Sequence, residues 1–343
     1  MDFYPQGFIS LMGERLEKTE ELLKRSGLRF MGGADYTVQL ISEEGETVGT
    51  GSLCGNVIKY VAIDERLRGE GAALTLISEL VSEAFRRDIT KLFLFTKAGN
   101  EMLFRSAGFY TLAATRDVCF MENTRSGLSR WLASVPRSEG KVGACVMNCN
   151  PFTKGHRYLV ETAAKQVDRL YVFVVSEDKS EFTFKERFAL VRAGTADIKN
   201  VTVLPSGDYM ISQATFPTYF LKEGADAESI YAALDLTLFA QKIAPALNIT
   251  VRFVGKEPYC AVTRNYNEIM KRLLPPCGIE VREIERLGFT EDTGGKPPLP
   301  ESKRAISASL VRRAILARDT ETLQKLVPET TYELIRERYF TDA

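Results

Sequence analysis

Apolar runs and amphipathic segments alternate along the second part of the chain, from residue 141 onward. Short apolar runs bounded by turn residues predict buried strands, and longer segments with apolar residues at helical spacing predict helices. Regular alternation of the two predicts a parallel sheet with helices on both faces. The expected strands are Val142–Met147, Leu170–Val175, Val201–Leu204, Ile230–Ala233, Thr250–Val254 and Ile279–Ile284, and the expected helices are Arg157–Gln166, Phe184–Ala193, Gln213–Leu221, Leu236–Ile243 and Arg264–Leu273.

The first part of the chain mixes returning strands with amphipathic helices. Strand-like segments at residues 36–41 and 47–53 flank a polar turn, and a third strand follows at residues 57–63. The other expected elements are helices at residues 10–28, 73–87 and 100–106, a strand at residues 92–96, and a strand that opens at Gly108. Residues 123–140 predict a short helix followed by a linker that contains Pro136.

The length of 343 residues is enough for two domains of ordinary size. We expect a first domain at residues 1–124, a linker at residues 125–140 and a second domain at residues 141–343. Because carboxyl ends of parallel strands carry ligands in such folds, the loop after residues 142–147 is the first place to look for chemistry.

Charge and cysteine content exclude several classes of function. Lysine plus arginine and aspartate plus glutamate both count 45, so no overall field favours nucleic acid or an anionic membrane. The six cysteines form no Cys-x-x-Cys pair, and with a single histidine they make a zinc site improbable. No apolar run is long enough to span a membrane. These features predict a cytoplasmic protein without a tightly bound metal.

The loop from Asn148 to His156 joins an expected strand to an expected helix. The first backbone N–H groups of a helix lack partners within it, so such a loop is suited to binding an anion. His156 is the only histidine in the chain and lies at this helix start. Cys149 also lies in the loop, where a small packing residue is a better interpretation than a nucleophile, since a catalytic thiol needs an activating base.

Two short segments resemble the signatures of the nucleotidylyltransferase superfamily. Thr153-Lys154-Gly155-His156 resembles its (His/Thr)-x-Gly-His signature, and Ile306 to Arg312 resembles its Ile-Ser-x-Thr/Ser-x-x-Arg. The two lie in family order, which implies a Rossmann-like (HUP-type) domain with a parallel sheet flanked by helices. The chain departs from the family where Met147-Asn148-Cys149 replaces the usual glycine pair, so it is not expected to be a standard coenzyme adenylyltransferase.

The resemblance implies a site for ATP, with Mg²⁺ carried on the triphosphate. His156 and Thr153 would be catalytic, donating to the phosphate in the transition state, and Arg312 would hold the β- or γ-phosphate. Ser307 and Ser309 either bind phosphate or cap the second helix. Arg187 either acts on the triphosphate or is solvated, and residues 294–298 are a candidate lid. The residues implied for ATP binding are Asn150, Thr153, Lys154, Gly155, His156, Gly255, Glu257, Ser307, Ser309 and Arg312.

A second loop, Arg66 to Ala72, resembles the Gln/Arg-x-x-Gly-x-Gly/Ala loop of the GNAT acetyltransferase fold. Glycines let a backbone approach a pyrophosphate, which the following helix N-terminus also faces. The resemblance covers roughly residues 30–122 and implies an α+β first domain. The residues implied to bind a coenzyme A-like arm are Arg66, Arg68, Gly69, Gly71 and Ala72.

The order of these two domains resembles the citrate lyase ligase family along nearly the whole chain. The matching segments run from Asn148 to Glu161, from Phe253 to Pro258 and from Ile306 to Ser309. The resemblance implies ATP-dependent acetylation of the thiol on the dephospho-CoA-like prosthetic group of the citrate lyase acyl carrier subunit. Acetate would first form acetyl-adenylate, and the first domain would hold the arm and direct its thiol to that intermediate.

Two alternatives remain open at this point. In one, the chain is a bifunctional enzyme with an independent acetyltransferase and a coenzyme adenylyltransferase. In the other, the nucleotidylyltransferase domain is joined to a docking domain without catalytic activity. The first alternative predicts turnover without a carrier protein, and the second predicts no affinity for coenzyme A-like ligands.

Overall fold

The computed structural model describes residues 2–67, 69–178, 180–211, 216–222, 224, 226–257, 260–290 and 303–340. The chain divides into two compact units. Met1–Trp131 and Thr215–Leu238 form the first, and Leu132–Ala214 and Phe239–Ala343 form the second. The domain boundaries expected from sequence stay a prediction, and the units differ from them chiefly because residues 215–238 join the first unit.

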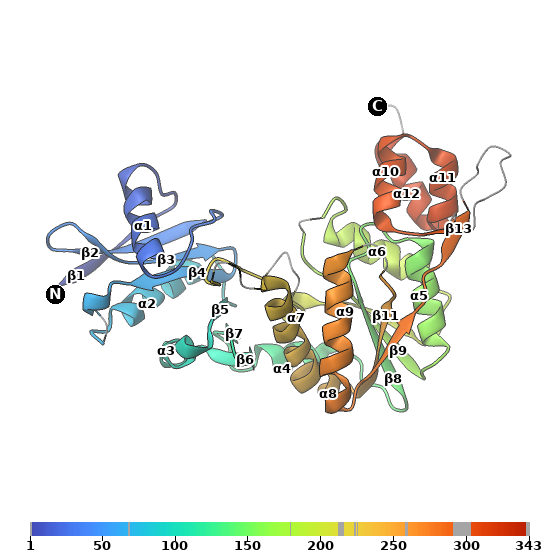
Figure 1. Cartoon of the computed structure of the whole chain (residues 1–343), viewed down its shortest axis with the longest axis horizontal. Coiled ribbons are helices and arrows are strands. Elements are labelled where there is room, and N and C mark those ends of the chain that lie inside the picture. The colour runs from blue at the N-terminus through green and yellow to red at the C-terminus, as the bar shows by residue number, and fades with distance from the viewer. Residues whose placement is uncertain are drawn as a thin grey trace. The chain divides into compact units, whose positions relative to one another are not determined.

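A seven-stranded sheet forms the centre of the first unit, in the order β1-β2-β3-β4-β5-β7-β6 (Figure 1). Neighbouring strands are antiparallel except β4 and β5, which are parallel and pair only at Val57–Phe93 and Ile58–Leu94. The two strands therefore part after Ile58. The strands are β1 (Phe3–Phe8), β2 (Tyr36–Ser42), β3 (Thr47–Cys54), β4 (Val57–Ile63), β5 (Phe93–Lys97), β6 (Tyr110–Ala114) and β7 (Val118–Glu122).

Helices α1 (Glu14–Arg25) and α2 (Ala72–Arg86) cover opposite faces of this sheet (Figure 1). Gln39 donates to Thr19 of α1 at 2.7 Å, whereas a Cβ added to Gly51 would meet leucines of α2. Since Gly51 pairs with Val38, next to Gln39, the two helices lie on different faces. The short helix α3 (Glu101–Ser106) follows β5.

Helix α7 (Ala227–Leu238) packs against β6 and β7 and completes the first unit. The ring of Phe216, in the segment before α7, meets Phe95 of β5 edge to face at 5.6 Å and Tyr231 of α7 at 6.1 Å. Phe95 lies on the face opposite α2, because its neighbour Leu94 belongs to the core beneath α2. Residue 216 and α7 are therefore on the same face as α1.

A five-stranded parallel sheet forms the centre of the second unit, in the order β10-β9-β8-β11-β12. Helices α5 (Lys154–Ala164) and α6 (Phe184–Gly194) pack on one face, and α9 (Ala261–Leu273) lies on the other side (Figure 1). The π-helical Phe239–Ile243 leads into α8 (Ala244–Ala246), which contacts β11. The strands are β8 (Val142–Met147), β9 (Arg169–Val174), β10 (Val201–Pro205), β11 (Ile249–Gly255) and β12 (Glu280–Ile284).

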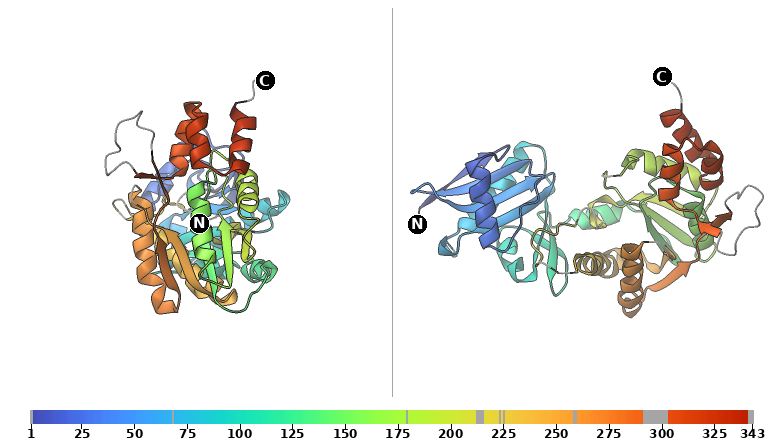
Figure 2. Two further views of the ribbon diagram at one scale, coloured as in Figure 1. Left: turned by 90° about the vertical axis from the view of Figure 1, so that its right-hand side faces the viewer. Right: turned by 45° about the horizontal axis from the view of Figure 1, so that its top comes forward.

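Three helices follow the second sheet: α10 (Ala308–Leu316), α11 (Thr320–Leu326) and α12 (Glu329–Tyr339) (Figure 2). They share a core of their own with Phe182 and Ile306, and α12 also packs on α6. A two-stranded antiparallel sheet of β13 (Gly288–Thr290) and β14 (Lys303–Ala305) precedes α10.

The expected fold class is confirmed: a GNAT-like α+β part with a mixed sheet and a Rossmann-like part with a parallel sheet. The helix expected within residues 123–140 is α4 (Gly127–Ser134). The strand expected at Ile230–Ala233 is wrong, because these residues lie inside α7. A short apolar run can be a strand or one buried turn of a helix, and periodicity alone does not separate them.

The helix expected at Gln213–Leu221 is also wrong for residues 216–221, which are not helical, while residues 213–215 lie outside the described part. The candidate lid at residues 294–298 lies outside it too. Strands β1 and β7 had no counterpart among the expected elements.

Candidate active site

The start of α5 fixes the single histidine through reciprocal hydrogen bonds. Thr153 is the N-cap, and its Oγ1 accepts from the backbone N–H of His156 at 3.2 Å. The backbone N–H of Thr153 in turn donates to Nδ1 of His156 at 3.0 Å. Because Nδ1 accepts a hydrogen bond, the neutral ring carries its proton on Nε2. The imidazole can therefore present an N–H donor beside a helix N-terminus.

The environment of His156 favours its neutral form. Desolvation, and then the positive charge of Arg286, lower the pKa of the imidazole to about 4. Phe152 stacks on the ring at 5.9 Å between centroids. At neutral pH the side chain is thus a neutral donor, and transfer of a proton from an imidazolium is not available to it.

The second motif lies directly against the first. A Cβ added to Gly155 would stand 3.2 Å from the carbonyl oxygen of Ile306, so glycine permits the close approach of the two backbones. Nη1 of Arg312 donates to the carbonyl oxygen of Asn150 at 2.6 Å, and Nη2 donates to Oγ of Ser309 at 3.2 Å. The two motifs are therefore in direct contact, although they lie far apart in the sequence.

Ser307 is the N-cap of α10, with its Oγ accepting from Leu310 N–H at 3.3 Å, so the capping alternative holds for this residue. Asn150 uses its side-chain oxygen to accept from Phe182 N–H at 3.1 Å. Cys149 is buried with a backbone φ of 53°, and burial raises the pKa of its thiol, which suits a packing role.

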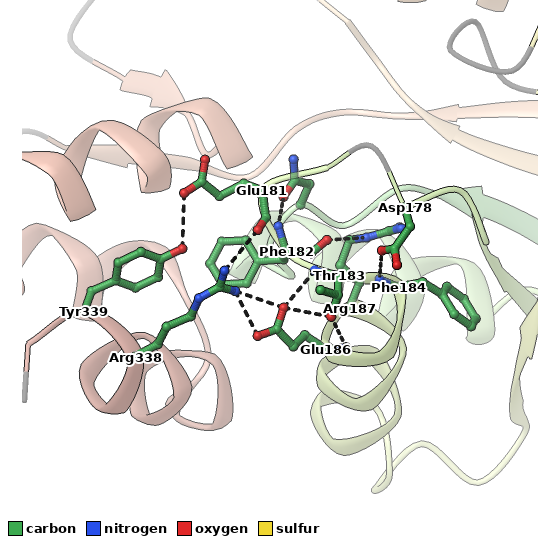
Figure 3. A network of polar contacts seen from close by, with 10 residues as sticks. Asp178, Glu181, Phe182, Thr183, Phe184, Glu186, Arg187, Arg338 and Tyr339 are labelled. Atoms are coloured by element: carbon green, nitrogen blue, oxygen red, sulfur yellow. Dashed lines mark hydrogen bonds and ion pairs between the residues drawn. The ribbon is translucent and has the colours of Figure 1, made fainter. Parts of the chain in front are cut away.

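Arg187 of α6 is fully buried and binds the loops around the site (Figure 3). Its Nη1 donates to the carbonyl oxygens of Asn148 and Val175, at 2.8 Å each, and its Nε donates to that of Phe182 at 3.0 Å. Nη2 donates to the carbonyl oxygen of Glu177. Both sequence-based alternatives for Arg187, phosphate binding and solvation, are therefore wrong. Desolvation lowers the pKa of the guanidinium, and the hydrogen bonds compensate for its burial.

Helix α12 holds the loop that leads into α6 (Figure 3). Nη1 of Arg338 contacts both carboxylate oxygens of Glu186, at 2.8 and 2.9 Å, and its guanidinium lies 5.3 Å from the ring of Phe182. Tyr339 donates to Glu181 at 3.2 Å. Glu186 also accepts from Thr183 N–H at 2.7 Å in the capping box of α6. The C-terminal helices thus support the same loop that Arg187 binds from within.

Other residues expected at the site have defined partners. Nζ of Lys154 donates to the carbonyl oxygen of Gln324 at 2.7 Å, at the end of α11. Glu257 is buried, accepts from Cys260 N–H at 3.0 Å and pairs with Arg286. Gly255 ends β11, and a Cβ there would meet nothing within 4 Å. Its carbonyl oxygen accepts from Asn267 at 3.1 Å.

The structure adds Arg286 to the residues expected from sequence, and it gives Arg187 a structural role that the sequence did not indicate. Arg286 follows β12, donates to the carbonyl oxygen of Lys256 at 2.7 Å and influences His156 by its charge. Its position just after a strand at the carboxyl edge of a parallel sheet was the available signal. No comparable signal marked this structural role of Arg187, which lies on an otherwise ordinary helix face.

The first unit contains a cavity of about 580 Å³ where β4 and β5 part. Gly69 and Gly71, with φ of 88° and 79°, and Ala72 line it at the start of α2. Arg66 is not among the lining residues: its Nη2 donates to Glu46 at 3.0 Å and its Nε to Asp64 at 3.0 Å. Its hydrogen bonds hold the pKa of Asp64 at about 2. Arg68 lies outside the described residues.

Two absences concern only the described part of the chain. Within it, no three His, Cys, Asp or Glu side chains are grouped as metal ligands would be. No helix of that part is long and apolar enough to cross a membrane.

Comparison with known proteins gives consistent results over the two units. The chain is 44% identical to a citrate (pro-3S)-lyase ligase of Klebsiella pneumoniae over 88% of its own length and 87% of the relative. Identity to the enzyme of that name from Haemophilus influenzae is 39%, over 96% and 97% of the two chains. A solved structure described as a putative acyl-CoA N-acyltransferase from Klebsiella pneumoniae covers 35% of this chain and 95% of its own, at 22% identity and a TM-score of 0.29.

The family model described as the citrate lyase ligase C-terminal domain matches residues 142–335, the range that contains both motifs and the strands that carry them. With this match and the full-length relatives above, the chain belongs to the citrate lyase ligase family of enzymes.

Proposed function

We propose that this protein activates citrate lyase by acetylating, at the expense of ATP, the thiol of the dephospho-CoA-like prosthetic group on the acyl carrier subunit. In the first step an acetate oxygen attacks the α-phosphorus of ATP, the bond to the β-phosphate oxygen breaks, and acetyl-adenylate and pyrophosphate form. In the second step the thiol sulfur attacks the acetyl carbon, AMP leaves and the thiol proton is lost.

The second unit would perform the first step. His156 would donate from Nε2 to an oxygen of the α-phosphate, where negative charge increases in the transition state, together with free N–H groups at the start of α5. A neutral donor fixed by its capping hydrogen bonds needs no rearrangement during the reaction. Arg312 would hold Asn150 and, with Arg286, add positive charge.

Mg²⁺ accompanies ATP in water, and the described residues offer no cluster of carboxylates to hold it. The ion would therefore be bound by the triphosphate itself. The donors assigned here are all nitrogen groups of the chain, which suit phosphate oxygens.

The first unit would bind the prosthetic arm. Gly69 and Gly71 leave the backbone open on the cavity at the start of α2, and no atom lies within 4 Å of a Cβ built on either. A pyrophosphate fits such a loop. Beyond it, the parted strands β4 and β5 leave backbone groups without strand partners, which an extended chain with amide groups can use.

One observation carries the proposal: two motifs distant in sequence meet at His156, through Gly155 against Ile306 and Arg312 on Asn150. A nucleotidyl-transfer site needs this meeting, because catalysis is mainly positioning and electrostatic stabilisation around the α-phosphate.

The test measures pyrophosphate release from ATP with acetate, with and without the deacetylated carrier. We expect acetate-dependent release that becomes catalytic in the presence of the carrier, together with AMP. If release needs no acetate, or if free phosphopantetheine compounds are adenylylated instead, the proposal is wrong and the bifunctional alternative gains support.

A further inference from the structure

The cavity of the first unit passes through its sheet. It is lined on one side by the start of α2 and by α3, including Gly71 and Phe104, and on the other by Leu28, which follows α1, and by Tyr219. Helices α1 and α2 cover opposite faces, so residues from both faces line a single opening. The opening exists because β4 and β5 stop pairing after Ile58 and Leu94.

Tyr219 and Phe220 line this opening on the α1 face, and Phe30 and Tyr60 pack with them. The rings of Phe30 and Tyr60 are 5.0 Å apart, those of Tyr60 and Tyr219 4.6 Å, and those of Tyr219 and Phe220 5.2 Å. Tyr219 is 6% exposed and Phe220 is 3% exposed. Phe216 extends the cluster from Phe220 at 6.1 Å to Phe95 at 5.6 Å.

The segment that supplies Tyr219 and Phe220 is fixed to the rest of the unit. The backbone N–H of Arg29 donates to the carbonyl oxygen of Tyr219 at 3.0 Å, and the hydroxyl of Tyr219 hydrogen-bonds to the backbone of Tyr60. Tyr60 has a φ of 59°, at an irregularity in the pairing of β3 with β4. The wall is therefore built from packed rings on a bulged strand.

We infer that Tyr219 and Phe220, held in place by Phe30 and Tyr60, form an end wall that admits an arm ending in a free thiol and excludes the same arm once it is acylated. The inference rests on the proposed function, because it takes the arm to enter past Gly69 and Gly71. It adds a specificity that the proposed function does not require: the first unit distinguishes substrate from product.

The physical reason is the packing of the wall. An arm that begins at the glycine loop and runs between β4 and β5 reaches the rings with its sulfur end. An acetyl group lengthens that end, and rings fixed by neighbours on both sides cannot yield without strain. We expect acylation to weaken binding by about tenfold or more, as one additional group in a closed apolar site does. The sulfur end therefore has to leave the wall before it is acetylated, and the acetylated arm does not return to compete with the next substrate.

The first test uses the intact protein and calorimetric titration with dephospho-coenzyme A and its S-methyl, S-ethyl and S-propyl thioethers, which do not hydrolyse. We expect the affinity to fall stepwise with the size of the S-substituent. Equal affinities for all members of the series, or no binding of dephospho-coenzyme A at all, overturn the inference. Pyrophosphate release from ATP and acetate is measured on the same preparation, so that failure of the adenylate-forming reaction is recognised separately.

The second test changes the wall. Tyr219→Ala should bring the affinities for dephospho-coenzyme A and its S-propyl thioether to within about threefold of each other, because the missing ring leaves room for the substituent. Tyr219→Phe keeps the ring and should keep the discrimination. A folded Tyr219→Ala protein that still rejects the thioether contradicts the inference. Should that variant not fold, Phe220→Leu removes part of the same wall and is judged by the same criterion.

Discussion

Nη1 of Arg312 donates a 2.6 Å hydrogen bond to the carbonyl oxygen of Asn150, which lies 162 residues earlier in the chain. The bond joins α10 to the loop that precedes α5. A charged donor on a backbone carbonyl fixes the loop more firmly than a neutral one would. The geometry at His156 therefore depends on a residue of the second motif.

Replacing Arg312 by Ala should raise the KM for ATP and destabilise the second unit by about 1–3 kcal/mol, the range for a hydrogen bond that involves a charged group. Steady-state pyrophosphate release and thermal unfolding measure the two effects. The control is Arg313→Ala, since Arg313 is the exposed neighbour on the same helix. If the Arg312→Ala protein loses this stability but keeps an unchanged KM for ATP, the role of Arg312 is purely structural.

Replacing Gly155 by Ala tests the close approach of the motifs. The new Cβ would stand 3.2 Å from the carbonyl oxygen of Ile306, so the backbones must separate by a few tenths of an ångström. Alanine also favours the helix by about 0.5–1 kcal/mol, so stability should change little. We expect kcat to fall about tenfold, less than the roughly 10²-fold effect of a 1 Å misplacement.

The control for this change is Gly99→Ala, because Gly99 has an ordinary φ and nothing within 4 Å of an added Cβ. Its rate of pyrophosphate release should match that of the unmodified protein. A Gly155→Ala protein with normal kcat would show that the contact with Ile306 is not needed for positioning.

The order of strand, loop and helix around His156 was predictable from sequence because its determinants are local, although α5 begins at Lys154 and not at the expected Arg157. The strand, the loop and the helix with its Thr153 cap come from one continuous segment of the sequence. The motif in the loop is the signal for an anion site at the helix start. The meeting of the motifs followed from family order. Their direct contact, through Gly155 and Arg312, needed the structure.

Non-local features were not predictable in the same way. Arg187 has the pattern of a surface helix residue, yet its partners are carbonyl oxygens from two separate loops that only the folded chain brings together. Residues 230–233 read as a strand because their burial comes from packing against β6 and β7 of the first unit's sheet, far away in sequence. In both cases tertiary contacts decide the environment, and local periodicity carries no information about them.

Two substitutions of His156 separate its capping role from its donor role. Asparagine can place an acceptor where Nδ1 stands, so His156→Asn should keep the bond to Thr153 N–H and the stability of α5. It lacks the Nε2 donor, and adenylate formation should fall roughly 10²–10³-fold. Glutamine can place an N–H near the Nε2 position, so His156→Gln should recover part of the rate. Equal activity of the two variants would exclude a donor role for Nε2.

The protonation of His156 can be followed directly, since an untagged chain contains one imidazole. Its pKa of about 4 lies below the ordinary value of 6.5, so the ring should stay neutral, with the proton on Nε2, from pH 5.5 upward. Long-range ¹⁵N–¹H spectra report both the tautomer and the titration. The unfolded chain takes up its proton first as the pH falls, so the contribution of His156 to stability is lost from about pH 6.5 towards pH 4. A ring that titrates near 6.5 would contradict the assigned environment.

The last prediction separates the two units by function. Gly69 and Gly71 have φ of 88° and 79° and open space around an added Cβ, so the double change to Val strains the loop and fills the place assigned to a pyrophosphate. Acetate-dependent pyrophosphate release should survive, because His156 lies in the second unit, while acetylation of the carrier should fall at least about tenfold. Backbone strain alone is controlled by the double change of Gly32 and Gly33 to Val, at φ of 71° and 73° in the same unit and likewise in open space. Both variants should lose similar stability, but only the variant at Gly69 and Gly71 should lose carrier acetylation and affinity for dephospho-coenzyme A. Normal carrier acetylation by a folded variant at Gly69 and Gly71 would contradict binding of the arm at this loop. Loss of both pyrophosphate release and carrier acetylation would mean that the damage is not confined to the first unit.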